Sequence, residues 1–346
     1  MNTGNTNKNN KFYITTAIAY VNAPPHMGHA FQFVRADAIA RYSRLTENDV
    51  FFLTGTDEYG SKMFKTAKEK NIEPQVLADE NAQKFQELDN FLNISYDDFI
   101  RTTDQKRHWP GAQLIWKKIN ENGDLYKKQY SGYYCSGCEA YVLESELTDG
   151  KCVYHNQKPE FIKEENYFFK LSKYAEKLIE LIEKNEIKII PESRKKEILN
   201  FAKQGLKDVS FSRPKSVLPW GILVPNDDSH VMYVWCDALA SYISALGYGS
   251  DNPEKFNRYW PADVHVIGKD NLRFHALYWP AMLLSVGLFP PKQIYVHGFV
   301  TSEGKKMSKT IGNVVDPKEI AEKYGTDALR YYLLKEISAT EDGDFT

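Results

Sequence analysis

Two histidines, His26 and His29, flank Gly28 at a point where an apolar run ends and a helical pattern begins. Where a parallel strand gives way to a helix, the first backbone N–H groups point outward and the helix dipole favours an anion. Pro24 and Pro25 fix the approach of the chain, and Gly28 lets a ligand come close to the backbone. Both imidazoles could donate hydrogen bonds to phosphate oxygens, or they could be only capping or surface groups. The turn is therefore a candidate phosphate site that needs a second signal.

That second signal lies near the other end of the chain, in a loop from Gly304 to Thr310. Lysines two or three residues apart, here Lys306 and Lys309, can close over a polyphosphate as mobile point charges. Taken alone, such lysines are usually only solvated. A histidine turn after the first expected strand, combined with a lysine loop after the last, predicts a site that binds a polyphosphate.

A third group of residues has the spacing of a metal site. Cys135-x-x-Cys138 and Cys152-x-x-His155 supply three thiolates and one imidazole. Four such ligands suit tetrahedral Zn²⁺, and a closed site of this kind is structural. Buried thiols or a redox pair are the alternatives, although a second half-site that ends in histidine argues against both. Cys236 stands apart and is predicted to be a packed residue.

The elements that must position these residues follow from hydrophobic periodicity. Aromatic and β-branched runs predict strands, and apolar residues at helical spacing predict helices. The expected strands cover residues 11–20, 49–54, 263–267 and 293–296. The expected helices cover residues 28–45, 61–70, 74–91, 105–122, 167–184, 191–203, 232–246, 272–286, 316–324 and 326–337. Strands alternate with helices at both ends, which is the order of a doubly wound parallel sheet of the Rossmann type.

The middle of the chain interrupts this alternation with short strands, the cysteine-rich knuckle and two charged helices. The economical interpretation is an α/β fold in which one nucleotide-binding sheet is interrupted by an inserted zinc-knuckle domain. The expected divisions are a disordered tail (1–10), the first half of the catalytic domain (11–122), the insertion (123–224), the second half of the catalytic domain (225–298), and the lysine loop with the start of a helical region (299–346).

Composition limits the classes of protein that this chain can belong to. Of its 346 residues, 42% are hydrophobic and 26% are charged, as in ordinary globular proteins. The formal net charge of -2 gives no general sign of nucleic-acid binding, so any RNA contact must use local patches. No stretch is apolar and long enough to cross a membrane, and the polar tail has no signal-peptide core. Clustered cysteines fit a reducing cytoplasm, and no membrane partner is expected.

The paired signatures resemble those of class I aminoacyl-tRNA synthetases. The His26 turn matches their HIGH sequence, and KMSKT matches their KMSKS loop, with Thr310 in place of serine. Threonine keeps the hydroxyl. Within this class the chain is similar to methionyl-tRNA synthetases, over roughly residues 11 to 346. The segments that carry the resemblance are AYVNAPPHMGH, TGTDEYG, YVWCDAL, IGKDNLRFHALYWPAML and HGFVTSEGKKMSKT.

The resemblance implies a two-step reaction. The methionine carboxylate attacks the α-phosphate of Mg-ATP, which gives methionyl-adenylate and pyrophosphate, and the methionyl group then moves to the 3′ end of tRNA(Met). Such chemistry depends mainly on positioning and charge neutralisation. The resemblance implies the following roles: phosphate contacts for His26 and His29, approach of ATP over Gly28, stabilisation of pyrophosphate by Lys306 and Lys309, ribose contacts for Asp270, and a backbone contact between Val300 and adenine.

The amino-acid side of the site is implied in the same way. Asp57 follows the second expected strand, where a carboxylate suits the ammonium group of the substrate, although a helix N-cap is the alternative. Methionine calls for an aromatic, dispersive pocket with a few polar contacts. The matching positions are Ile18, Tyr20, Trp235, Ala238, Tyr242 and His275. Leu239 and Asn271 depart from residues common in relatives, where proline and an apolar residue are found, so the detailed shape of the pocket is open.

Two other functions remain as alternatives. A class I synthetase for Leu, Ile or Val would carry a long editing insertion, and one for Cys would hold zinc with scattered ligands. A non-catalytic, synthetase-like tRNA-binding protein is the other. Methionyl enzymes continue into a helical domain that reads the anticodon, and this sequence stops before such helices. We therefore expect this polypeptide to form the adenylate but to charge tRNA poorly.

Overall fold

The computed structural model describes residues 10–137, 140–142, 144, 147–153, 156–307 and 315–345. Seven of the described strands form one parallel sheet: Lys11–Thr16 (β1), Ala19–Tyr20 (β2), Asp49–Asp57 (β3), Asp98–Arg101 (β4), Lys188–Ile190 (β10), Val264–Gly268 (β15) and Gln293–His297 (β16). Their order is β10-β16-β15-β1-β3-β2, with β4 also paired to β3. The prediction of an α/β fold around a parallel, Rossmann-like sheet is confirmed.

The central strand β1 shows how the sheet is held between two cores. Ile14 lies opposite Val264 of β15 on one side and Phe52 of β3 on the other. Successive side chains of a strand point to opposite faces. Tyr13 accordingly belongs to one buried cluster and Ile14 to the other. Because all pairings are parallel, the carboxyl ends of β1, β3 and β15 meet at one edge, where open α/β sheets bind ligands.

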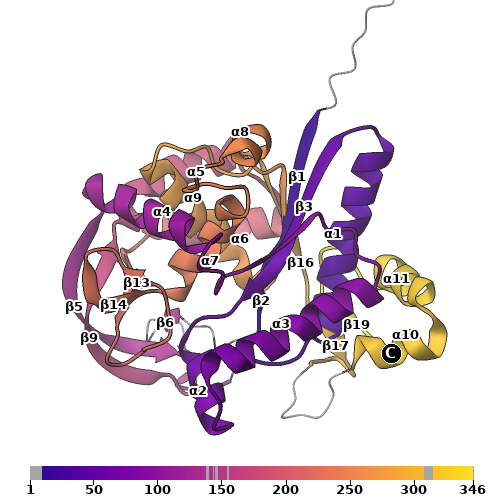
Figure 1. The fold of residues 1–346 in the computed structure, drawn as a ribbon, viewed down its shortest axis with the longest axis horizontal. Coiled ribbons are helices and arrows are strands. Elements are labelled where there is room, and N and C mark those ends of the chain that lie inside the picture. The colour runs from indigo at the N-terminus through magenta and orange to yellow at the C-terminus, as the bar shows by residue number, and fades with distance from the viewer. Residues whose placement is uncertain are drawn as a thin grey trace, which may run out of the picture.

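Helices cover both faces of the sheet (Figure 1). The helices packed around the Ile14 cluster include Met27–Leu45 (α1), Ser61–Glu69 (α2), Pro74–Phe91 (α3), Pro317–Tyr324 (α10) and Thr326–Lys335 (α11). Those around the Tyr13 cluster include Trp109–Glu121 (α4), Ala175–Glu183 (α5), Glu192–Lys203 (α6), Val234–Ser244 (α7), Glu254–Tyr259 (α8) and Trp279–Ser285 (α9). A 3₁₀ turn at Lys269–Asn271 and a π-helical turn at Phe274–Tyr278 precede α9.

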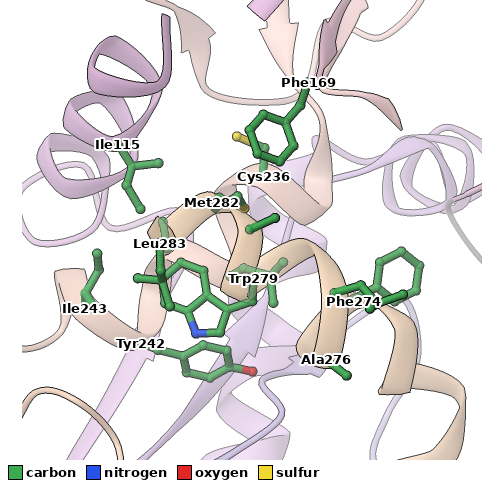
Figure 2. Close-up of a cluster of buried hydrophobic side chains, with 14 of the residues drawn as sticks. Ile115, Phe169, Cys236, Tyr242, Ile243, Phe274, Ala276, Trp279, Met282 and Leu283 are labelled. Carbon is green, nitrogen blue, oxygen red and sulfur yellow. The ribbon is translucent and has the colours of Figure 1, made fainter. Parts of the chain in front are cut away.

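The core between α7 and α9 is dense and aromatic. The indole of Trp279 is fully buried and lies against the ring of Tyr242, with ring centroids 6.1 Å apart (Figure 2). Figure 2 also shows Met282 and Leu283 beside the same indole. Cys236, near the start of α7, lies close to Phe169. Cys236 is fully buried, as predicted for a packed residue. This packing holds α7 rigidly next to the sheet.

The inserted segment forms antiparallel sheets. Its main sheet has the order β11-β9-β5-β6, built on the long pair Leu125–Cys135 (β5) and Glu160–Phe169 (β9). The remaining strands are Ala140–Val142 (β6), Leu147–Thr148 (β7), Lys151–Cys152 (β8), Val209–Ser210 (β11), Ser212–Pro214 (β12) and Leu223–Val224 (β13). Asp227–Met232 (β14) lies beyond the expected end of the insertion at residue 224, and yet it pairs antiparallel with β12 and β13. A 3₁₀ turn at Leu171–Tyr174 then leads into α5.

Several expected element boundaries were wrong. The strand expected at residues 11–20 is two strands, because the chain bends at Ala17 and Ile18. The helix expected from residue 167 begins only at Ala175, since residues 167–169 complete β9 by pairing with the start of β5. β4 and β10 were missed because three or four residues are too few to show a period. β10 lies within the range assigned to the insertion, and yet it joins the parallel sheet.

After β16 the chain forms a small sheet of Val300–Ser302 (β17), Lys305–Lys306 (β18) and Gly343–Asp344 (β19). β19 pairs in parallel with β17, so the stretch after α11 returns to the start of the lysine loop. Asp316 caps α10 by accepting a hydrogen bond from the amide of Lys318 (2.8 Å). In the described part of the chain, no helix has the length and apolar character that a membrane span requires. Most of the expected disordered tail, residues 1–9, lies outside the described residues.

Candidate active site

A cavity of about 430 Å³ lies at the carboxyl ends of β1, β3 and β15. Six of the residues predicted to bind methionine or ATP line it: Ile18, Tyr20, His29, Asp57, Trp235 and Asp270. Six others predicted for these two ligands are not part of its lining: His26, Gly28, Ala238, Tyr242, His275 and Val300. Residues from both ends of the sequence therefore meet at one edge of the sheet, at the position where an α/β fold places its ligand site.

The turn that carries His26 and His29 is a reciprocal helix cap. Nδ1 of His26 accepts a hydrogen bond from the amide of Gly28, and Nδ1 of His29 accepts one from the amide of His26, both at 3.1 Å. A neutral imidazole that accepts through Nδ1 carries its proton on Nε2. Capping therefore uses only one nitrogen of each ring. The cap does not use the Nε2 atom of either ring, so the capping role and the phosphate-binding role are compatible.

Burial keeps the His29 ring neutral. Desolvation lowers the pKa of His29 well below its ordinary value, and the nearby rings of His26 and His297 lower it further. The ring is held at its edge by Phe85, with centroids 4.9 Å apart and planes at 83°. At neutral pH the side chain is thus a fixed hydrogen-bond donor, which can contact a phosphate oxygen without first losing or gaining a proton.

Gly28 is required by the way His26 folds back over the turn. A Cβ atom at position 28 would lie 2.9 Å from Cε1 of His26, closer than real Cβ contacts allow. A larger residue would therefore push the imidazole away and break the hydrogen bond to the amide of Gly28. The glycine preserves both the cap and the close approach of the helix start to the cavity.

Asp57 and Tyr20 form the next part of the wall. Asp57 is the last residue of β3 and not a residue beyond it, and its side chain is buried at the cavity surface. The helix that follows is capped by Gly60 without a side-chain bond, so Asp57 is not its N-cap. Tyr20 pairs beside Asp57 across β2 and β3, and its hydroxyl accepts a hydrogen bond from the amide of Met63 (3.1 Å). A carboxylate fixed here can bind a cationic group in the cavity.

The aromatic part of the wall comes from α7 and the π-helical turn. Trp235 stacks face to face on Phe274, with ring centroids 3.6 Å apart. Nε1 of Trp235 has no hydrogen-bond partner among the described residues, so it can serve a ligand. Ala238 and Leu239 are buried one turn further along α7, behind this surface. Asn271 does line the cavity, so this departure places a polar side chain at the predicted amino-acid pocket.

Tyr242 and His275 lie behind the wall, in a hydrogen-bonded chain. Nδ1 of His275 is 3.0 Å from the carbonyl oxygen of Asn271, so it must carry a proton and donate. Its Nε2 is then an acceptor, and the hydroxyl of Tyr242 donates to it at 2.7 Å. Burial lowers the pKa of His275 to about 4, which keeps this arrangement in place at neutral pH. The donor and the acceptor of both hydrogen bonds are thereby fixed.

Several cavity residues were not predicted. Gln32 lies one helical turn beyond His29, and its Nε2 donates to the carbonyl of Ala17 (2.9 Å). Glu197 of α6 and Arg273 also contribute to the lining. The helical spacing from His29 could have identified Gln32, because residues three apart share a helix face. Glu197 gave no such signal, since it looked like one charged residue of a solvated helix.

The lysine loop is only partly described. Lys306 belongs to β18, but its side chain, and Lys309 and Thr310 altogether, lie outside the described residues. Val300 is buried in β17, where it lies opposite Gly343. The predicted contacts of these lysines and of the Val300 backbone with ATP therefore stay predictions.

The predicted metal knuckle is also only partly described. Cys135 ends β5 and Cys152 ends β8, and both side chains are buried. Cys138 and His155 lie outside the described residues. Within the described residues, no group of three or more His, Cys, Asp and Glu side chains is arranged to hold a metal. Cys152 and its neighbour Val153 also line the cavity, so the knuckle borders the site.

Comparisons with known proteins agree with this geometry. The family described as tRNA synthetases class I (M) matches residues 12–147 and 138–346. The chain is 50% identical over 339 residues to the methionine–tRNA ligase of Rhizobium meliloti (strain 1021), covering 97% of this chain and 65% of that protein. It is 51% identical over 336 residues to that of Clostridium acetobutylicum, with 97% and 52% covered. The chain thus spans about half to two thirds of the length of these relatives.

Solved structures give the same answer. A methionyl-tRNA synthetase of Mycobacterium tuberculosis in complex with methionyl-adenylate matches with a TM-score of 0.93 and 45% identity, covering 97% of this chain and 66% of that one. The ligand-free form of the same synthetase matches with a TM-score of 0.82 and 42% identity, with 97% and 64% covered. From the family match over nearly its whole length, this chain belongs to the class I tRNA synthetases (M).

Proposed function

We propose that this chain activates methionine with ATP to methionyl-adenylate and transfers the methionyl group to the 3′ end of tRNA(Met), in the cytoplasm. The observation that carries the proposal is the cavity in which His29, Asp57 and Trp235 meet. The 45% identity to a synthetase in complex with methionyl-adenylate supports it. A cavity of this size can hold an amino acid joined to a nucleotide.

At the nucleotide end, Mg-ATP is the proposed substrate. The Nε2–H groups of His26 and His29 would donate to phosphate oxygens, and Gly28 would let the phosphates approach the start of α1. As the α-phosphate is attacked, negative charge grows on pyrophosphate. Lys306 and Lys309 would neutralise that charge, as the family resemblance implies. Asp270 would accept hydrogen bonds from the ribose hydroxyls, and the Val300 backbone would meet the adenine.

At the amino-acid end, Asp57 would bind the ammonium group of methionine. This contact orients the carboxylate toward the α-phosphate, so that the attack becomes a reaction between two groups held side by side. The side chain of methionine would lie against Ile18, Tyr20 and Trp235, which line the cavity. Ala238, Tyr242 and His275, predicted for the same pocket, would support this surface from behind. Flat aromatic surfaces give a thioether strong dispersion contacts, and a few fixed polar groups reject side chains of other shapes.

We also propose a structural Zn²⁺ held by Cys135, Cys138, Cys152 and His155. The described pair supports it, because both thiols are buried at strand ends. A closed tetrahedral site supplies cross-linking, not catalysis. The ion would tie the end of β5 to the end of β8 and so fix the stretch around Cys152 that borders the cavity.

The test is ATP–pyrophosphate exchange across a panel of amino acids. Purified protein should exchange label with methionine and give no signal with leucine, isoleucine, valine or cysteine. An Asp57→Ala variant, prepared in the same way, should be inactive, which excludes contamination by a synthetase of the expression host. Exchange driven best by another amino acid would overturn the methionine assignment. The absence of exchange with every amino acid, from folded protein, would favour a non-catalytic relative. Aminoacylation of purified tRNA(Met) tests the second step separately.

A further inference from the structure

A second carboxyl group is buried next to the cavity and has no role in the mechanism above. Asp237 lies in the first turn of α7, between Trp235 and Ala238, and its side chain is fully buried. Neither of its oxygens has a side-chain hydrogen-bond partner among the described residues, and the backbone amide of Ala238 is the one donor that acts on the group. A lone, ionised carboxylate in such a place is strongly unfavourable. The group must either be protonated or be matched by a cation that this structure does not contain.

Asp237 lies close enough to Asp57 for their charges to interact. Burial raises the pKa of Asp237 well above its ordinary value, and the negative charge of Asp57 raises it further. Two carboxyl groups that interact in a poorly solvated region do not both ionise readily, and their protons belong to the pair. Asp57 lines the cavity and Asp237 does not, so the cavity-facing member keeps the charge that a ligand meets.

We propose that Asp237 is a positioning residue for the amino-acid ammonium group, acting through Asp57: it holds a proton in the free protein and releases it when the ammonium group binds. This inference rests on the proposed function. In the step, the O–H bond of the Asp237 carboxylic acid breaks and its proton passes to the buffer. No other bond changes. The ammonium group then contacts Asp57, with the second negative charge of Asp237 buried next to the cavity, which favours substrates that carry this group over uncharged analogues.

The groups around the pair do not titrate near neutral pH. Those that interact with the pair are Tyr59 after β3 and Cys236 and Tyr242 of α7, and His275 of the π-helical turn accepts a hydrogen bond from Tyr242. Burial raises the pKa values of Tyr59, Tyr242 and Cys236, and it lowers that of His275 to about 4. Tyr59 also lies near the ion pair of Glu58 with Arg101. A proton released near pH 7 is therefore attributed to the Asp57–Asp237 pair.

The experiment is calorimetric titration of the protein with methionine near neutral pH, in phosphate and in Tris buffer. These buffers differ in ionisation enthalpy, so proton release appears as a difference between the two binding enthalpies. The wild-type protein should release a measurable fraction of a proton, and Asp237→Asn should release none, because an amide cannot ionise. In pyrophosphate exchange the same variant should raise KM for methionine by about tenfold and leave KM for ATP unchanged.

Two controls make the result decisive. Cys236→Ala alters the neighbouring buried side chain without touching a carboxyl group, so it should keep the proton release. Methioninol, which keeps the ammonium group but lacks the carboxylate, should release the same proton from wild-type protein. This second arm needs no variant and holds even if Asp237→Asn fails to fold.

Equal binding enthalpies in both buffers for the wild type would overturn the proposal. So would a folded Asp237→Asn variant that still releases the proton, or release with methionine but none with methioninol. These outcomes are separate from failure of the proposed function. Active exchange with methionine but no proton release removes only the role of Asp237, whereas no exchange with methionine removes the substrate assignment itself.

Discussion

The indole of Trp235 lies flat on the ring of Phe274, with centroids 3.6 Å apart and planes inclined by only 5°. The two rings come from α7 and from the π-helical turn, so their stacking joins two separate elements of the cavity wall. Both residues line the cavity. The wall that would receive the methionine side chain is therefore a composite surface, and its flatness depends on both partners.

Replacing Phe274 by leucine should weaken methionine binding while the fold is kept. Leucine is apolar and similar in volume, but it cannot stack, and an aromatic pair contributes about 0.5–1.5 kcal/mol beyond its buried area. We expect KM for methionine to rise about 2- to 10-fold in pyrophosphate exchange, with KM for ATP unchanged. The control is Phe289→Leu, since this ring is 77% exposed and is not part of the cavity lining. A rise in both KM values would indicate general disruption of the site.

Patterns that extend over many residues could be predicted from the sequence. The alternation of strands and helices gave the parallel sheet, and the turn at His26 lies at its carboxyl edge as expected. Such features depend on local geometry that repeats, so many residues contribute to the same hydrophobic period and indicate the same element. The short strand β10 could not be found in this way, because its three residues derive their structure from pairing with β16.

Proton positions and buried polar contacts at the site could not be predicted either. His26 and His29 were recognised as phosphate ligands or caps, and only the fold shows that the cap uses Nδ1 and not Nε2 of each ring. Likewise, Tyr242 and His275 were placed in the pocket by resemblance, whereas they lie behind its lining. The cap is local, but the ring nitrogen that it uses follows from the backbone geometry of the turn. The contact between Tyr242 and His275 joins residues 33 positions apart, and it depends on tertiary packing, which single-sequence patterns do not encode.

Acid should destabilise this protein through its buried histidines. Burial lowers the pKa of His108 to about 3 and the pKa values of His275 and His297 to about 4. The same side chains in the unfolded chain have pKa values near about 6.5. Between these limits the unfolded chain binds protons that the folded chain does not. The free energy of unfolding should therefore be fully present above about pH 6.5 and fall as the pH is lowered.

The expected slope approaches roughly 1.4 kcal/mol per pH unit for each histidine. Urea titrations at several pH values between about 5 and 8 would measure it. In His108→Asn, the side-chain amide can replace the contact of Nδ1 with the hydroxyl of Ser244. The pH dependence of the free energy of unfolding should then be smaller by the contribution of one histidine. Stability that stays constant down to pH 5 would show that the buried rings do not control acid sensitivity.

Zinc removal should affect the knuckle and, through it, the cavity. Cys152→Ser should reduce the metal content from about one zinc per chain to well below that value, since a tetrahedral site needs all four ligands. Atomic emission on purified protein measures this directly. Cys236→Ser is the matched control, because it also changes a buried thiol but lies outside the knuckle. Because Cys152 and Val153 border the cavity, loss of the ion should also weaken methionine binding. Equal zinc content in both variants would contradict the proposed ligand set.

The loop lysine gives the sharpest test of the chemical step. Lys309→Ala should leave ATP binding nearly intact but slow adenylate formation by about 100-fold or more, because the contact is made mainly as negative charge develops on the departing pyrophosphate. Single-turnover formation of the adenylate measures the rate, and equilibrium binding of ATP measures the affinity. Lys117→Ala, on the exposed face of α4, is the charge-matched control and should change neither quantity. An unchanged rate in Lys309→Ala would remove this lysine from the mechanism, and a large loss of ATP affinity would assign it to ground-state binding instead.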